Sequence, residues 1–202
     1  RDMTQKAGQK CTAIRRILVP LEFLSPVKQD LTELLGAVKV GDPAQEDVRM
    51  GPLVSRAQLD DVRAGVERLA GDGKQVTGNS ALKFEKGFFI SPTLFEHKPD
   101  STTVHDREVF GPIASLLPYT ENPAAIVARG NGGLVCSVYS EDTSWLEEVV
   151  TGIAPYHGRL FLGHPKIELS PGPGTVLPQL VHGGPGRAGG GEELGGRRAL
   201  AF

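Results

Sequence analysis

The residue types best suited to covalent chemistry gather around Cys11. This cysteine ends the run Gly8-Gln9-Lys10-Cys11, where small neighbours leave room for a substrate carbonyl to reach the sulfur. Lys10 and Arg15 are close in sequence, and positive charge favours the thiolate, which is the nucleophilic form. An apolar strand-like run begins only at Ile17, so Cys11 falls in a glycine-containing turn, where functional groups tend to be exposed. We interpret Cys11 as a candidate nucleophile; the alternative is a buried cysteine that acts as a small hydrophobe.

A second constellation lies in the run Arg107-Glu108-Val109-Phe110-Gly111-Pro112. Glu108 and Phe110 are two residues apart, so an extended backbone would place both side chains on one face. The pair suits a nucleoside, because a carboxylate accepts hydrogen bonds from ribose hydroxyls while an aromatic ring packs on a flat heterocycle. The alternative is that Phe110 belongs to the core and that Glu108 is a solvated surface charge.

Alternating strand-like and helix-like segments must position these residues. Extended segments are expected at 15–19, 87–94, 134–139 and 159–162, and helices at 26–40, 56–70, 122–129 and 144–153. Ser25 is predicted to cap the first helix, with Pro26 at its first position and Gly41 as its stop. Ser55 and Gln58 form a predicted capping box. This alternation predicts an α/β fold, with a largely parallel twisted sheet flanked by helices.

Composition and charge narrow the possible partners and compartment. The 202-residue chain has a formal net charge of −2, which gives no reason to expect nucleic acid or an anionic membrane as a partner. No apolar run approaches about 18 residues, so no transmembrane helix is expected. The two cysteines have dissimilar surroundings, which argues against a disulfide framework and fits the cytoplasm. The histidines at 157, 164 and 182 lack metal-ligand spacing, so no metal site is expected.

Together, the two constellations make the chain resemble the aldehyde dehydrogenase superfamily. The nucleophile motif of that family, with an arginine four residues after the cysteine, is matched by Gly8, Gln9, Cys11 and Arg15. Its Glu-x-Phe-Gly-Pro motif is matched by Glu108, Phe110, Gly111 and Pro112. The stretches 51–55 and 87–93 also look like family landmarks, and they occur in the family's order. The segment 178–190 is similar to the bifunctional aldehyde dehydrogenases of phenylacetate degradation, which carry a hydratase-like module as well.

The resemblance implies an aldehyde dehydrogenase catalytic domain over 1–162, followed by a Gly/Pro-rich tail over 163–202 that leads toward an oligomerisation element. It implies that the Cys11 thiolate attacks a small-molecule aldehyde, and that the Cys11 backbone N–H and an asparagine side chain hold the oxyanion. NADP or NAD would accept the hydride, with Glu108 on its ribose and Phe110 packed nearby. In the similar subgroup the substrate resembles a CoA-linked semialdehyde, and NADP is the usual acceptor. The intact protein is expected to be a cytoplasmic homo-oligomer.

The same resemblance exposes what the chain lacks. The family's asparagine, its general-base glutamate and its phosphate-side cofactor loop all precede the cysteine, and none occurs before Cys11 here. We therefore expect a fragment whose N-terminal cofactor domain is absent and which is inactive in isolation. A cysteine hydrolase or thioesterase is an alternative, but it needs a histidine base that no sequence feature pairs with Cys11. A non-catalytic scaffold protein is a further alternative.

The second cysteine, Cys136, lies inside the apolar run 134–138 and is expected in the core.

Overall fold

The computed structural model describes residues 1–78, 82, 84–165 and 182–190. Two compact units divide the chain, one over residues 1–121 and one over 122–202, and each is described by itself. Most of the predicted tail, and residues 178–181 of the stretch similar to the phenylacetate-degradation proteins, lie outside the described residues. The predicted domain boundary at 162/163 stays a prediction.

The first unit is built on a mainly parallel four-stranded sheet with the order β1-β4-β3-β2. Its strands are β1 (Arg16–Pro20), β2 (Gly73–Thr77), β3 (Thr93–His97) and β4 (Ile113–Tyr119). β4 pairs in parallel with β1 and β3, whereas the edge strand β2 runs antiparallel to β3. The helices of the unit are α1 (Leu24–Gly36), α2 (Arg56–Ala70) and α3 (Thr103–Asp106), with 3-10 turns η1 (Gln5–Gly8) and η2 (Leu21–Phe23). The predicted α/β class with a largely parallel sheet is confirmed.

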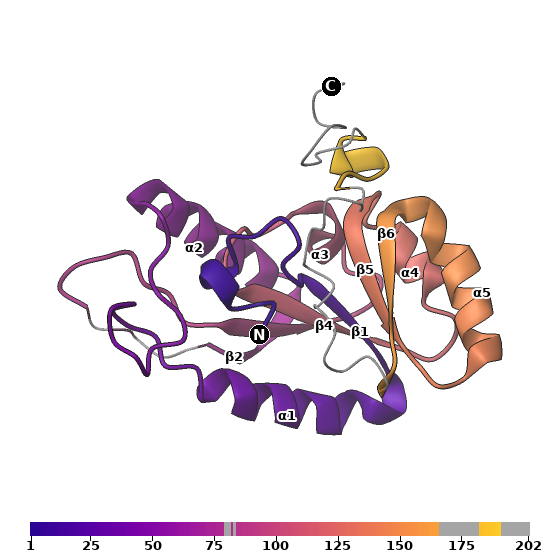
Figure 1. Ribbon diagram of the computed structural model, residues 1–202, viewed down its shortest axis with the longest axis horizontal. Helices are drawn as coiled ribbons and strands as arrows, with labels where there is room; N and C mark the ends of the chain where they lie inside the picture. The colour runs from indigo at the N-terminus through magenta and orange to yellow at the C-terminus, as the bar shows by residue number, and fades with distance from the viewer. Residues whose placement is uncertain (79–81, 83, 166–181, 191–202) are drawn as a thin grey trace. The chain divides into compact units, whose positions relative to one another are not determined.

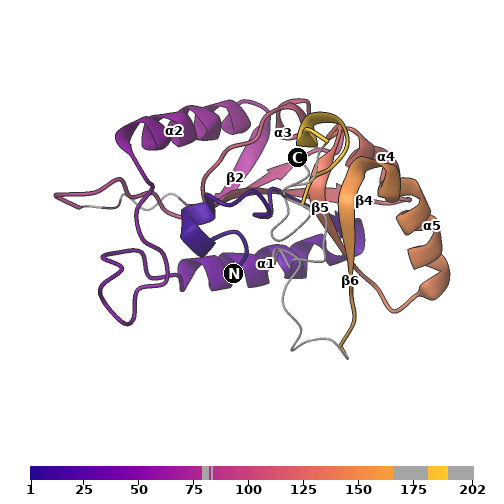
Figure 2. The same cartoon turned by 45° about the horizontal axis from the view of Figure 1, so that its top comes forward.

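Helices cover both faces of this sheet, with α1 along one face and α2 along the opposite face (Figures 1 and 2). Leu94 of β3 and Leu116 of β4 are fully buried on the α1 side, where the apolar stripe of that helix packs against them. The α1 stripe consists of Leu24, Val27, Leu31 and Leu35. On the predicted helix of residues 56–70, which forms α2, Leu59, Val62 and Leu69 are buried at helical spacing.

The sequence pattern did not predict the central strand β4. Residues 113–117 are all buried, because helices cover both faces of the sheet. A strand buried on both sides has no alternation of apolar and polar residues, and that alternation is the usual strand signal. The edge strand β2 was also unpredicted. The extended segment expected at 87–94 begins its pairing only at Thr93, so its first part is loop.

The boundaries of α1 differ from the predicted ones at both ends. The helix begins at Leu24, directly after η2, so Ser25 lies inside the first turn and is not the cap. The helix ends at Gly36 rather than before Gly41. After the helix, Lys39 O accepts hydrogen bonds from Arg49 N–H (2.9 Å) and Met50 N–H (3.2 Å), and Val40 forms a parallel bridge with Met50.

The second unit contains a parallel pair of strands, β5 (Gly133–Tyr139) and β6 (His157–Gly163). Its helices are α4 (Ala124–Ala128) and α5 (Thr143–Ile153), with 3-10 turns η3 (Ala154–Tyr156) and η5 (Gly186–Ala188). Its two strands and its helices α4 and α5 match the predicted segments to within a few residues, whereas η3 and η5 were not predicted. Cys136 is half-buried rather than in the core, because neither strand of a two-stranded sheet is central. In the described part of the chain, none of the helices has the length and apolarity needed to span a bilayer.

Asp72 joins the end of α2 to the turn before α3. One carboxylate oxygen accepts hydrogen bonds from Ser101 Oγ (2.5 Å) and Thr103 N–H (3.3 Å), and the other lies 3.3 Å from Nε2 of the buried His97. Partial burial raises the pKa of Asp72, but these hydrogen bonds and the nearby imidazole outweigh burial, so the pKa lies below its usual value. The charged carboxylate therefore stabilises the fold.

We expect Asp72→Asn to lower the free energy of unfolding by about 1 kcal/mol at neutral pH. A depressed folded-state pKa gives stability that is complete above the unfolded-state pKa and is lost as the pH falls through the folded-state pKa. The deficit of the variant should therefore shrink below about pH 4. Urea unfolding at several pH values measures it. Asp30→Asn, on the exposed side of α1, is the control, and an equal deficit at every pH would contradict the assignment.

Gly8 lies where two backbone segments nearly touch. Lys6, Ala7 and Gly8 have positive φ values of 53°, 51° and 70°, so one left-handed turn precedes the cysteine. A Cβ placed on Gly8 would lie 2.1 Å from Gly111 O, a separation that no side chain tolerates. Only glycine permits both this conformation and this approach.

We expect Gly8→Ala to lower the free energy of unfolding by at least about 2 kcal/mol, because the two segments must separate. Gly36→Ala is the matched control. Its added Cβ, at the end of α1, would meet nothing within 4 Å, so that variant should be neutral or more stable by up to about 1 kcal/mol. Thermal unfolding of both variants measures the difference. A Gly8→Ala variant as stable as Gly36→Ala would disprove the close approach.

Candidate active site

Arg15, directly before β1, connects the two constellations that the sequence singles out. Its Nη2 donates to Gly8 O (2.7 Å) in the cysteine loop, and its Nη1 donates to Gly111 O (2.7 Å). Its Nε donates to Glu108 Oε1 (3.1 Å), and its guanidinium carbon lies 5.4 Å from the centre of the Phe110 ring. One side chain thus joins the loop of the candidate nucleophile to the loop of the candidate nucleotide-binding pair.

The sheet explains why these loops meet. β1 and β4 are parallel, with Arg16 opposite Ser115, and Ser115 N–H donates to Arg15 O (2.8 Å). The segments that enter two adjacent parallel strands lie at the same end of the sheet. The cysteine loop enters β1 and the Glu108 loop enters β4, so the order of strands brings together residues that are 93 positions apart.

The neighbouring Arg16 holds the end of α3, the helix that leads into the Glu108 loop. Its Nη1 lies 3.0 Å from Nδ1 of the buried His105, whose Nε2 lies 3.0 Å from Pro99 O. A guanidinium can only donate, so Nδ1 of His105 accepts and Nε2 carries the proton. Arg15 and Arg16 therefore fix the segment 105–111 at three residues, His105, Glu108 and Gly111.

The charge of Arg15 is largely withdrawn from solvent. Burial lowers the pKa of its guanidinium, while the charge of Glu108 and their hydrogen bond oppose that change. The group nevertheless stays protonated, as arginine does throughout the physiological range. The side chain of Arg15 is only 18% exposed and that of Glu108 is 46% exposed, so the carboxylate faces solvent while its partner does not.

Glu108 and Phe110 are brought together, but not by an extended strand. Residues 107–110 form a loop, in which the Glu108 carboxylate bonds the edge of the Arg15 guanidinium and the Phe110 ring lies against its face. Phe110 is 36% exposed, so it does not belong to the core. Glu108 Oε2 accepts no hydrogen bond from the described residues. A solvent-facing carboxylate oxygen beside an exposed aromatic ring fits a ribose and its attached ring.

Cys11 is exposed, in a turn closed by the hydrogen bond from Ala13 N–H to Lys10 O (2.9 Å). This exposure leaves the sulfur accessible, as attack on a carbonyl requires. Both nearby cations that the sequence pointed to are paired with carboxylates. Lys10 Nζ contacts Asp2 (3.1 Å) and Gln5 (2.9 Å), and Arg15 contacts Glu108, so each positive charge near the thiol is partly compensated.

Two glutamines attach the start of α2 to the site, and the sequence pattern did not reveal these contacts. Gln9 Oε1 accepts from Val54 N–H (2.9 Å), next to the cap of α2. Ser55 Oγ caps the helix by accepting from Gln58 N–H (3.1 Å), as predicted. The Gln58 side chain, however, donates to Phe110 O (2.9 Å) and does not complete the capping box. The capping-box motif thus predicted where Gln58 lies in the sequence, but not that its side chain would bond Phe110 O.

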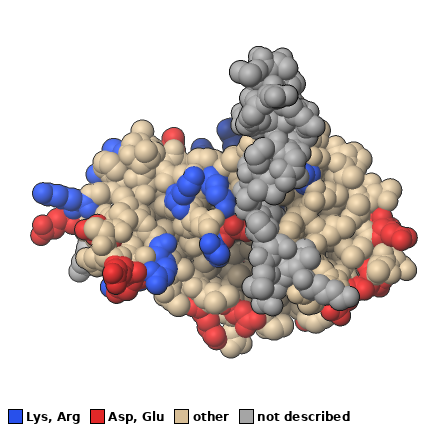
Figure 3. Space-filling model, viewed as in Figure 1, with Lys and Arg blue, Asp and Glu red and all other residues tan. Residues whose placement is uncertain are grey.

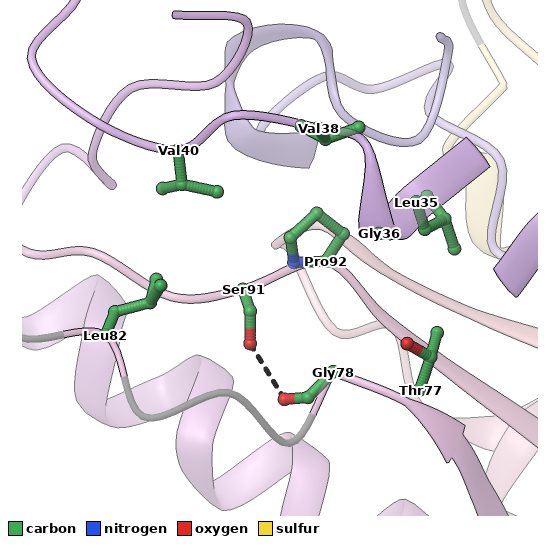
Figure 4. A pocket seen from close by; sticks show the side chains of 9 residues that line it. All are labelled: Leu35, Gly36, Val38, Val40, Thr77, Gly78, Leu82, Ser91 and Pro92. Atoms are coloured by element: carbon green, nitrogen blue, oxygen red, sulfur yellow. Dashed lines mark hydrogen bonds between the residues drawn. The ribbon is translucent and has the colours of Figure 1, made fainter. Parts of the chain in front are cut away.

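A small hollow elsewhere in the first unit is separate from these residues. It has a volume of about 130 Å³ and contains the hydrogen bond from Ser91 Oγ to Gly78 O (Figure 4). None of Cys11, Glu108 and Phe110 lines it. Its walls are Leu35, Gly36, Val38, Val40, Thr77, Gly78, Leu82, Ser91 and Pro92.

Positively and negatively charged side chains both occur on the face shown in Figure 3. Among the described residues, no three of His, Cys, Asp or Glu gather as a metal site.

The chain is similar to known proteins over most of its length. The model of the aldehyde dehydrogenase family matches residues 1–164. The 3,4-dehydroadipyl-CoA semialdehyde dehydrogenase of Aromatoleum evansii is 42% identical over 197 residues, which cover 92% of this chain and 38% of that protein. Protein MaoC of Klebsiella aerogenes is 43% identical over 157 residues, which cover 75% of this chain and 47% of that protein. The chain thus spans less than half the length of these relatives.

Solved structures show the same fold. Aldehyde dehydrogenase C of Pseudomonas syringae, a mutant in complex with NAD+ and octanal, superposes with a TM-score of 0.77 at 28% identity, over 94% of this chain and 38% of that one. Betaine aldehyde dehydrogenase of Staphylococcus aureus, in complex with NAD+, gives a TM-score of 0.81 at 23% identity, over 99% of this chain and 39% of that one. With its family match over residues 1–164, the chain belongs to the aldehyde dehydrogenase family.

Proposed function

We propose that this chain supplies the nucleophile and part of the nucleotide site of an enzyme that oxidises an aldehyde to a carboxylic acid with NADP or NAD. The observation that carries the proposal is the junction at Arg15. There, the loop of an exposed thiol is joined to a solvent-facing carboxylate and an exposed aromatic ring. Family membership supports the reaction class.

Cys11 performs the covalent step. Its thiolate attacks the aldehyde carbon, a carbon–sulfur bond forms, and the carbonyl oxygen becomes the oxyanion of a thiohemiacetal. The Cys11 backbone N–H and an asparagine side chain hold that oxyanion in the proposed reaction. Loss of hydride from the same carbon leaves a thioester on Cys11. Water, deprotonated by a glutamate base, releases the carboxylic acid and restores the thiol.

Glu108 and Phe110 bind the nucleotide in this proposal. Oε1 of Glu108 is held by Arg15, which leaves Oε2 to accept from ribose hydroxyls. The partly exposed ring of Phe110 offers an apolar face beside that carboxylate. When bound, a nicotinamide nucleotide supplies the hydride acceptor. These residues orient the ribose, and therefore the ring attached to it, with respect to the cysteine loop that Arg15 also holds.

The proposed substrate is a CoA-linked semialdehyde, of the kind formed in phenylacetate degradation. The support is the 42% identity to 3,4-dehydroadipyl-CoA semialdehyde dehydrogenase, which extends over 92% of the chain. The proposed intact enzyme works as a homo-oligomer in the cytoplasm. Comparing kcat/KM for a CoA-linked semialdehyde with that for the same aldehyde without CoA tests the substrate. Equal values for the two would contradict the CoA assignment.

We expect Cys11→Ala, made in the full-length protein that carries this chain, to lower the rate of aldehyde oxidation by on the order of 10³-fold or more. The reason is that alanine lacks the sulfur that forms the carbon–sulfur bond of the thiohemiacetal. Formation of reduced nicotinamide, followed by absorbance, measures the rate. Cys136→Ala, at the half-buried cysteine of β5, is the matched control and should stay within about twofold of the wild type.

Two results would overturn this assignment. One is a Cys11→Ala variant that is folded, by circular dichroism, and keeps most of its activity. The other is release of a carboxylic acid from an activated ester in the absence of nicotinamide, together with no oxidation of any aldehyde. That second result would favour a cysteine hydrolase.

A further inference from the structure

We propose that Arg15 is a positioning residue for nucleotide binding, which holds the Glu108 carboxylate in its ribose-binding orientation. This inference rests on the proposed function, because it presumes that Glu108 binds the ribose. It goes further by assigning the orientation of Glu108, and hence part of the nucleotide affinity, to a residue that lies in the cysteine motif.

The first argument concerns the freedom of the Glu108 side chain. Glutamate has several rotamers, and fixing them costs on the order of 1–2 kcal/mol when a ligand binds. Here the carboxylate is nearly half exposed and lies on a loop, yet Oε1 is already bonded to Arg15 Nε at 3.1 Å. Much of the ordering is therefore complete before the nucleotide arrives, which favours binding.

The second argument concerns the geometry of the guanidinium. Three nitrogen atoms of one planar group donate to Glu108 Oε1, Gly111 O and Gly8 O, and Nη2 also donates to Lys10 O at 3.5 Å. The face of the same plane lies over the Phe110 ring, with 5.4 Å between the guanidinium carbon and the ring centre. A lysine ammonium carries the same charge but has neither the planar fork nor the stacking face. Arg15→Lys therefore keeps the positive charge but removes the planar hydrogen-bonding group, so it tests whether the geometry of the guanidinium matters.

The third argument concerns what holds the Arg15 guanidinium itself in place. The acceptors Gly8 O and Gly111 O are backbone carbonyls, and the segments that carry them approach so closely that Gly8 admits no side chain. The guanidinium is thus anchored to main chain on both sides and is mostly buried, whereas the carboxylate it holds faces solvent. The main chain orients Arg15, and Arg15 orients Glu108.

The experiment is a double-mutant cycle in the full-length protein, with Arg15→Lys, Glu108→Gln and the double variant. Dissociation constants for NADP+ and NAD+ are measured by titration calorimetry, alongside kcat, the KM for each substrate and the melting temperature. We expect each single variant to weaken nucleotide binding by about tenfold, with the KM for aldehyde little changed. The double variant should bind no more weakly than the weaker single variant, because Arg15 acts through Glu108.

Arg56→Lys is the matched control. Arg56 also lies over an aromatic ring of the first unit, with its guanidinium carbon 5.2 Å from the centre of the Phe88 ring. This substitution should leave the nucleotide dissociation constant within about twofold of the wild type. Should Arg15→Lys fail to fold, Glu108→Asp replaces it in the test. That variant keeps the charge but withdraws the carboxylate from Arg15 Nε by one methylene, and it should weaken nucleotide binding as much as Glu108→Gln does.

Three results would overturn the inference. The first is normal nucleotide affinity in Arg15→Lys. The second is a double variant whose loss is the product of the two single losses, which would give Arg15 an independent, structural role. The third is wild-type affinity in Glu108→Asp. Normal affinity in Glu108→Gln would instead remove the ribose-binding role in the proposed function, and the inference with it. That outcome is recognised from the single variant alone.

Discussion

A buried guanidinium must have its charge and its N–H donors satisfied, and Arg15 finds those partners on both loops of the candidate site. It bonds the backbone carbonyls of Gly8 and Gly111, more weakly that of Lys10, and the carboxylate of Glu108. Loss of Gly8 O or Gly111 O as a partner would leave a partly buried donor unpaired, which is costly. One side chain therefore helps to fix the distance between the two loops, and with it the relative positions of the exposed groups that the loops carry.

The remaining structure makes this junction possible. Parallel pairing of β1 with β4 brings both loops to one end of the sheet, and the missing side chain of Gly8 lets their backbones approach. Gln9 and Gln58 then attach the start of α2 to the same two loops. Burial of Leu94 and Leu116 under α1 holds the strands themselves in place. The site thus depends on main-chain contacts from several elements, which suits groups that must face solvent while remaining ordered.

Local patterns predicted most of the elements but not the middle of the sheet. The apolar stripe of α2 and its cap at Ser55 were predictable, because helical spacing and an N-cap are local signals. β4 was not, since a strand covered on both faces loses its alternation. The early end of α1 also escaped prediction. The residues that follow it pair with Arg49 and Met50, a contact between separate segments that local spacing does not reveal.

The sequence by itself determined which residues carry chemistry: a cysteine in a glycine-containing turn, and a glutamate two residues from a phenylalanine. It also placed an arginine four residues after that cysteine. Only the tertiary structure decided that this arginine faces Glu108 rather than serving the thiol alone, and that Phe110 is exposed. The physical reason is that residue types and spacings are local, whereas the partner of a buried charge depends on which strands are neighbours.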